Sequence, residues 1–207
     1  NQDGQNPVKK INNYMKMDDQ YIWESLTASP VSITVTESDN VGYGCLMVFL
    51  DDESASEIRT FARDNIPEEF LDEFGFEDEP HITCQYGFHG SVTVDEITEF
   101  IQTIDTPIKV ALGDITRFTQ DAYDVIKMDI ISKDLHDLSD KIRKHFKETL
   151  EVAFPEYQPH MTLAYVKKGK LPYINANNMF QGKNYVFDEF VYSTPNMEEK
   201  YDINKNT

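Results

Sequence analysis

The chain has 207 residues, of which 40% are apolar, enough for the core of one domain or of two small lobes. It shows no apolar run near the ~18 residues that a membrane-spanning helix needs, and no secretory signal pattern at its N-terminus. The formal net charge is −18. Because long nucleic acids are bound mainly through lysine and arginine, this charge favours a small phosphorylated substrate over a long polyanion. The two cysteines fit buried thiols, and we expect a cytoplasmic protein.

The first 80 residues are predicted to contain an arm, strands and helices. Residues 1–20 are polar, and residues 1–39 are predicted to form a partly disordered N-terminal arm with one strand at 31–35. The apolar run at 41–50 predicts a buried strand, and the spacing of the apolar residues after it predicts a helix that runs through Ala62. The acidic stretch 68–79 is predicted to form a short helix with a solvated face.

The middle of the chain alternates between strands and helices. Residues 81–88 are predicted to form a strand. Thr93 and Glu96 form a capping-box pattern, which opens a helix that Pro107 ends. Residues 108–118 follow as the next strand.

The last part of the chain predicts three further strands and one helix. A strand at 122–131 is followed by a helix at 133–149 with an apolar stripe along one side. Residues 160–166 and 185–192 predict two more strands, and residues 196–207 form a polar tail. This order of elements is typical of a mixed α+β fold.

One short pattern occurs twice in the sequence. Residues 80–84 and residues 159–163 each consist of proline, histidine, an apolar residue, threonine and a second apolar residue. A strand sends residues i and i+2 to the same face, so the histidine and threonine of each copy point the same way. If the two strands are neighbours, all four side chains enter one space.

These four residues are the candidate catalytic group. His81 and His160 can act as an acid/base pair near neutral pH, because an ordinary imidazole has a pKa near ~6.5. Thr83 and Thr162 can hydrogen-bond the oxygens of one phosphate. One neutral imidazole can take a proton from a nucleophile while one imidazolium supplies a proton to the leaving oxygen, and this scheme needs no metal. The pattern does not decide which histidine is the base.

Two other interpretations use the same residues. Each histidine could simply be half-buried in its strand and bonded to a backbone carbonyl. Both could instead be metal ligands, but a metal site needs a third ligand, and the sequence contains no H-E-x-x-H or C-x-x-C spacing. We predict neither a metal nor a cofactor.

The duplicated H-x-T-x pattern resembles the motifs of the 2H phosphoesterase superfamily, and the resemblance covers roughly residues 40–195. It implies an α+β fold of two pseudo-symmetric lobes. Each lobe would be an antiparallel sheet with helices outside, and the motif strands would face a central cleft. It also implies a hydrolase that acts on phosphodiester bonds.

Three further residues are candidates for substrate binding. Tyr43 lies between two glycines on the strand before the first motif and could stack on a base, although core packing is an equal alternative. Phe118, at the end of a strand, is a second stacking candidate. Glu189 could reach a ribose or a base edge, or could face solvent as an ordinary strand carboxylate.

The resemblance leaves several substrates open. Members of the superfamily act on 2′,3′-cyclic phosphates or 2′–5′ linkages of RNA ends, and phage anti-CBASS members cut cyclic oligonucleotide messengers. The acidic charge and sparse basic surface favour the cyclic oligonucleotides, which would place the protein in the host cytoplasm if a phage encodes it. The best basic patch, Lys167, Lys168 and Lys170, could equally be a solvated turn. A protein that only sequesters the nucleotide is the alternative of another class.

Overall fold

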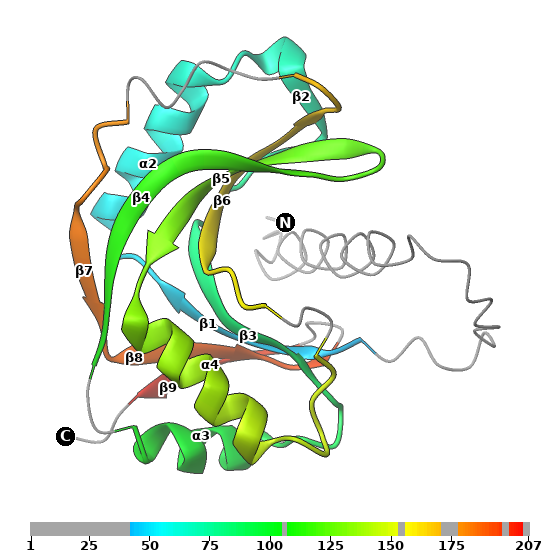
Figure 1. The fold of residues 1–207 in the computed structure, drawn as a ribbon, viewed down its shortest axis with the longest axis vertical. Helices are drawn as coiled ribbons and strands as arrows, with labels where there is room; N and C mark the ends of the chain where they lie inside the picture. Colours follow the sequence, from blue (N-terminus) through cyan, green and yellow to red (C-terminus); the bar gives the residue numbers. More distant parts are fainter. Residues whose placement is uncertain (1–41, 105–106, 153–155, 171–177, 196–198, 205–207) are drawn as a thin grey trace, which may run out of the picture.

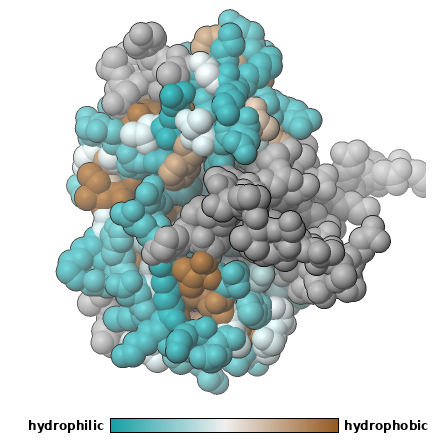
Figure 2. Space-filling model, turned by 45° about the vertical axis from the view of Figure 1, so that its right-hand side comes forward, coloured by the Kyte–Doolittle hydropathy of each residue, from teal (hydrophilic) through white to brown (hydrophobic). Residues whose placement is uncertain are grey.

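The computed structural model describes five stretches of the chain: residues 42–104, 107–152, 156–170, 178–195 and 199–204. The predicted arm at 1–39, with its strand at 31–35, lies outside these residues. Within the described stretches, no helix has both the length and the apolar character required to cross a membrane. Their surface is largely hydrophilic, with apolar side chains confined to small patches in the view of Figure 2.

Two antiparallel sheets form the frame of the molecule (Figure 1). Sheet A has four strands in the order β3-β1-β8-β9, and sheet B has five in the order β2-β6-β5-β4-β7. The strand bounds are Gly44–Phe49 for β1, Leu71–Phe76 for β2, His81–Phe88 for β3, Ile108–Thr119 for β4, Tyr123–Ile131 for β5, His160–Lys167 for β6, Asn184–Phe187 for β7, Glu189–Ser193 for β8 and Lys200–Asn204 for β9.

Three helices accompany the sheets. Helix α2 (Asp52–Asn65) packs against β2 and β6 of sheet B. Helix α3 (Val94–Gln102) packs against β9, and helix α4 (Lys133–His145) packs against β3 and β4. Figure 1 shows α2 beside sheet B and the other two helices beside sheet A. The prediction of an α+β fold of two antiparallel lobes with helices is confirmed.

Each helix begins where its cap satisfies the first backbone N–H groups. The carboxylate of Asp51 accepts a hydrogen bond from the backbone N–H of Ser54 at 2.9 Å, before α2. Thr93 and Glu96 form the predicted capping box of α3. Local sequence alone therefore sets these starting points.

The core lies between the helices and the outer faces of the two sheets. In β3, Ile82 and Cys84 are fully buried in this core, while the residues before and after Ile82 remain partly exposed. In β6, Met161 and Leu163 are buried in the same way. The strand alternation therefore sends the apolar residues of both motifs outward to the core, as predicted for Cys84.

The predicted helix at 68–79 is wrong. A single 3-10 turn, Glu68–Phe70, precedes strand β2, which pairs with β6 at the edge of sheet B. The apolar spacing around Phe74 resembles that of a helix, but the unpaired backbone groups of β6 need a neighbouring strand, and that long-range pairing prevails. Gly75, with φ of 72°, interrupts the register within β2.

Two predictions near the C-terminus also need correction. The single strand predicted at 185–192 is two strands, because the chain leaves sheet B after β7 and enters sheet A at β8, with Asp188 between them. The predicted tail at 196–207 contains β9, which pairs with β8 along its length. In β9, Tyr201 and Ile203 pack against the core, a pattern too short to stand out in a polar sequence.

Candidate active site

The two motif strands approach each other where the sheets meet (Figure 1). In both strands the histidine and the threonine are partly exposed, and the residue between them is buried. His81 and Thr83 therefore lie on the inner face of sheet A, and His160 and Thr162 lie on the inner face of sheet B. This is the alternation that the sequence predicts.

Both imidazoles are held by the same kind of hydrogen bond to the backbone. Nδ1 of His81 bonds to the carbonyl oxygen of Glu79, and Nδ1 of His160 bonds to that of Gln158, each at 2.8 Å and each two residues upstream. A carbonyl oxygen can only accept, so Nδ1 carries the proton in both rings. In the neutral imidazole the lone pair then lies on Nε2, which can accept a proton from a ligand.

The segment that leads into each motif also bonds to the opposite motif strand. The hydroxyl of Tyr157 donates to the carbonyl oxygen of Thr83 at 2.7 Å. The backbone N–H of Glu77 donates to the carbonyl oxygen of Leu163 at 3.0 Å. Burial raises the pKa of Tyr157 well above its usual range, so the hydroxyl keeps its proton and stays a donor. These reciprocal bonds fix the two motif strands relative to each other.

Glu77 also supports His81 through its side chain. Its Oε1 accepts a hydrogen bond from the backbone N–H of Glu79 at 2.9 Å, and the carbonyl of Glu79 is the group that holds the His81 ring. Burial raises the pKa of the Glu77 carboxyl to about 7, although this hydrogen bond works in the opposite direction. Glu77 was predicted to lie on a solvated acidic face, because nothing in a run of acidic residues distinguishes the one that becomes buried.

An aromatic ring packs against each histidine. The ring of Phe49 lies 5.4 Å from that of His81, and the ring of Phe118 lies 4.8 Å from that of His160, edge to face. The structure therefore brings the predicted residue Phe118 to the motif. Phe49 was missed, but its place on the strand next to β3 puts it directly opposite His81 in the register.

A lysine lies over each of these aromatic rings. Nζ of Lys127 is 4.3 Å from the centroid of Phe118, and Nζ of Lys200 is 5.5 Å from the centroid of Phe49. Lys127 is buried and stands opposite Thr162 in the pairing of β5 with β6, whereas Lys200 is partly exposed and pairs with Glu79 at 2.9 Å. Neither lysine belongs to a motif that could be recognised in the sequence.

The electrostatic environment of His160 lowers its pKa to about 4. Burial of the imidazole is the largest cause, although part of the residue remains exposed. The positive charges of Lys127 and His81 act in the same direction, while the bond to the Gln158 carbonyl and the charge of Asp129 oppose them. A protonated His81 therefore disfavours a charge on His160, as expected for two imidazoles on adjoining motif strands.

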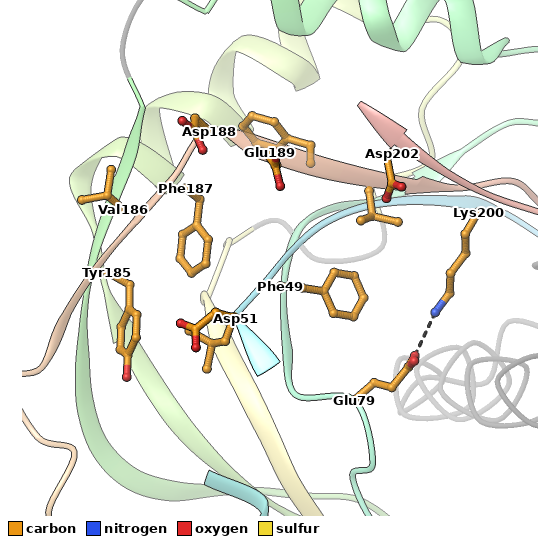
Figure 3. A pocket seen from close by; sticks show the side chains of 13 residues that line it. Phe49, Asp51, Glu79, Tyr185, Val186, Phe187, Asp188, Glu189, Lys200 and Asp202 are labelled. Carbon is orange, nitrogen blue, oxygen red and sulfur yellow. Dashed lines mark hydrogen bonds and ion pairs between the residues drawn. The ribbon is translucent and has the colours of Figure 1, made fainter. Parts of the chain in front are cut away.

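A pocket of about 670 Å³ opens beside the first motif (Figure 3). His81 does not line it directly, and the pocket adjoins that histidine through Phe49 and Glu79. Glu189 lines the pocket, so the structure places this predicted residue near the first motif but not on it. The wall combines Lys200 with aromatic and acidic side chains, among them Phe49, Asp51, Glu79, Tyr185, Phe187, Asp188, Glu189 and Asp202.

Two other candidate groups lie away from the two motif histidines, His81 and His160. Tyr43 precedes β1, and its ring packs near that of Tyr86. Tyr86 lies near the C-terminal end of β3, whereas His81 begins this strand. The basic patch begins at Lys167, the last residue of β6, and its Lys167 and Lys168 donate to backbone carbonyls of the protein. Neither group adjoins the His/Thr pairs. In the described part of the chain, no three His, Cys, Asp or Glu side chains gather as metal ligands would.

The fold and the paired motifs define a two-lobed protein of the 2H phosphoesterase type. The family model of the 2'-5' RNA ligase superfamily matches residues 50–186, and the chain belongs to this superfamily. This membership confirms the prediction of an enzyme that acts on phosphodiester bonds. A comparison with curated protein sequences finds no significant match.

Solved structures share the fold at low sequence identity. Escherichia coli LigT complexed with phosphate has a TM-score of 0.55 and 15% identity, over 79% of this chain and 98% of that one. Thermus thermophilus TT0787 has a TM-score of 0.53 and 14% identity, over 80% and 100%. Kluyveromyces marxianus Usb1 with uridine monophosphate has a TM-score of 0.51 and 8% identity, over 80% and 99%.

Proposed function

We propose that the protein is a metal-independent phosphodiesterase that hydrolyses small nucleotides, with cyclic oligonucleotide messengers as its best candidate substrates. The observation that carries the proposal is the mirrored pair of motifs. His81 and His160 have the same tautomer, each with a threonine two residues further on. Such an arrangement supplies a base, an acid and two hydroxyls around one phosphate.

The reaction follows from the two imidazoles. One neutral ring takes the proton of an attacking water as the new oxygen–phosphorus bond forms. The other ring, protonated, gives its proton to the leaving oxygen as the old bond breaks. The hydroxyls of Thr83 and Thr162 donate to the non-bridging oxygens, where negative charge builds.

The charges around the site favour a small substrate. The pocket beside the first motif is lined by carboxylates and aromatic rings, with Lys200 already paired to Glu79. A groove that follows a long RNA backbone would instead need a track of unpaired cations. Aromatic walls can stack on bases, which suits a compact nucleotide.

Cyclic oligonucleotides are the finer part of the proposal. Their phosphates close into a ring, so one phosphodiester enters the His/Thr site while the bases spread to either side. Phe118 and Glu189 would then contact bases or riboses on opposite sides of the cleft, because they lie on sheets B and A respectively. Tyr43 lies just before β1, beside Tyr86 of β3, and would meet only the outer part of such a ligand. This activity fits a phage protein that removes host defence signals.

The test is a hydrolysis assay with excess EDTA. The wild type, H81A and H160A would be incubated with cyclic dinucleotides, cyclic trinucleotides and 2′,3′-cyclic mononucleotides, and the products separated by chromatography. We expect cleavage of a cyclic oligonucleotide by the wild type and loss of cleavage in both variants. Equal activity in all three proteins would refute the two-histidine mechanism.

The same assay separates the alternatives. Cleavage of 2′,3′-cyclic mononucleotides alone would assign the protein to RNA-end processing. Binding without cleavage, unchanged in H81A, would make it a protein that sequesters nucleotides. The retained pairs of histidine and threonine favour turnover over sequestration.

A further inference from the structure

Lys127 is a buried cation beside the second motif. Only 5% of the residue is exposed, and Nζ donates a 2.8 Å hydrogen bond to Oγ1 of Thr116 and forms an ion pair with Asp129. Burial of a lysine lowers the stability of a protein unless its charge is paired. The partners of Lys127 come from two strands, β4 and β5. The fold therefore holds this ammonium group in one position.

That position is next to His160. The Phe118 ring contacts both groups: its centroid is 4.3 Å from Nζ of Lys127 and 4.8 Å from that of the imidazole, which it meets edge to face. Lys127 and Asp129 stand opposite Thr162 and His160 in the pairing of β5 with β6, so all four belong to one face of sheet B.

The other half of the cleft has a lysine with different properties. Lys200 lies over Phe49, but its ion pair with Glu79 is partly exposed, with 24% and 44% of the two side chains accessible. Solvent screens such a pair, so its effect on His81 is weak. The two lobes thus present an ion pair with a buried lysine to His160 and an ion pair with a partly exposed lysine to His81.

We propose that Lys127 is a positioning residue of the active site that makes His160 the general base and His81 the general acid. This inference rests on the proposed function and assigns the base and the acid of that reaction. The attacking water gives its proton to Nε2 of His160 as its oxygen bonds to phosphorus. The bond from phosphorus to the leaving oxygen breaks, and that oxygen takes the proton from Nε2 of His81.

The charged groups that act on His160 come from two strands, β5 and β3. Lys127 and the protonated form of His81 disfavour a charge on the ring, while Asp129 favours one. Removing the ammonium group should therefore make His160 easier to protonate. Burial would still act on the ring, so only part of the shift in its pKa would be lost.

The decisive measurement is a titration that needs no substrate. Proton–nitrogen correlation spectra of protein with 15N-labelled histidine would follow all five histidines from pH 3 to 8, with H160Q identifying the His160 signals. We expect the midpoint of His160 to move to higher pH in K127M. It should stay low in K127R, which keeps the charge, and in the matched variant K200M. Asp129→Asn should move it to lower pH.

The pH dependence of kcat/KM then connects the titration to catalysis. The acid limb should follow the His160 midpoint. A full return of that midpoint to ~6.5 would reduce kcat/KM at pH 5 by about 30-fold, and because burial keeps part of the shift, K127M should lose less than this. An unmoved midpoint in folded K127M, or an equal shift in K200M, would overturn the role of Lys127 and leave the proposed phosphodiesterase intact. Absence of turnover in the wild type would overturn the proposed function, while the titration would still report the electrostatic effect.

Discussion

The two halves of the candidate site, one on sheet A and one on sheet B, have the same backbone arrangement around the histidine but different surrounding side chains. In both, a histidine donates from Nδ1 to a carbonyl two residues upstream, and an aromatic ring with a lysine over it packs against the imidazole. The lysine of sheet B is buried, and that of sheet A is screened by solvent. On the proposed mechanism, a near-symmetric fold would carry out an asymmetric reaction, because the acid and the base would differ in their neighbours and not in their motifs.

The largest expected effect separates the roles of the two histidines. H81A and H160A should each lose about 10²–10⁴-fold in kcat on an ester with an alkoxide leaving group. p-Nitrophenolate leaves without needing a proton, so on the p-nitrophenyl ester of thymidine 5′-phosphate H81A should recover most of its activity, and H160A should not. Steady-state release of nitrophenolate measures this, and recovery by H160A instead would reverse the assignment.

The threonines test whether both halves hold the phosphate. T83V and T162V remove one hydroxyl each while keeping the shape, and each should lower kcat by about 10²-fold, because a hydrogen-bond donor to the developing charge is gone. T60V, on the exposed side of α2, is the matched control and should match the wild type. A rise in KM alone would show that the hydroxyls bind substrate without favouring the transition state.

The burial of Glu77, just before the first motif, can be tested through the pH dependence of protein stability. Its folded pKa of about 7 lies above the usual ~4.3, so folding retains a proton that the unfolded chain loses. The free energy of unfolding of the wild type should therefore fall by about 2–4 kcal/mol as the pH rises from about 4 to 7. E77Q keeps the acceptor for Glu79 and should lack this loss, which urea denaturation at pH 4 and pH 8 would measure.

The second half offers the control for Glu77. Glu156 stands at the corresponding place, four residues before His160, and it is exposed. E156Q should leave the free energy of unfolding at both pH values close to that of the wild type. Equal pH dependence in the wild type and E77Q would show that the Glu77 carboxylate is solvated.

The smallest expected effect concerns the aromatic partners. Contacts between aromatic rings contribute about 0.5–1.5 kcal/mol beyond the area they bury. F118L and F49L should thus each reduce kcat/KM about 2–10-fold, since each removes the ring that packs against one histidine. Competition kinetics between the variants and the wild type would resolve such a difference, and an unchanged kcat/KM in both variants would mean that the rings only fill space.

Much of the site could be predicted because its information is local. The alternation of His81, Ile82 and Thr83 fixes which side chains face the core, and the capping box of α3 lies within four residues. A histidine and threonine two apart on an apolar strand need no knowledge of the rest of the fold. The duplicated pattern then pointed to the shared cleft.

The missed features depend on pairing between distant segments. Lys127 enters the site only because β5 pairs with β6 in a register that sets it opposite Thr162. Phe49 meets His81 through the pairing of β1 with β3. A lysine or phenylalanine on a strand is common, and nothing within its own segment reveals which strand becomes its neighbour.

The order of strands has a consequence for how the chain reaches its native state. Sheet A combines β1 and β3 with β8 and β9 from the other end of the chain, and sheet B combines β2 with strands β4 to β7. Neither half of the sequence can complete a sheet by itself. Loops that join such distant segments must close before their contacts form, which slows folding. We expect one cooperative and slow folding transition for both lobes, without a stage in which one lobe stands alone.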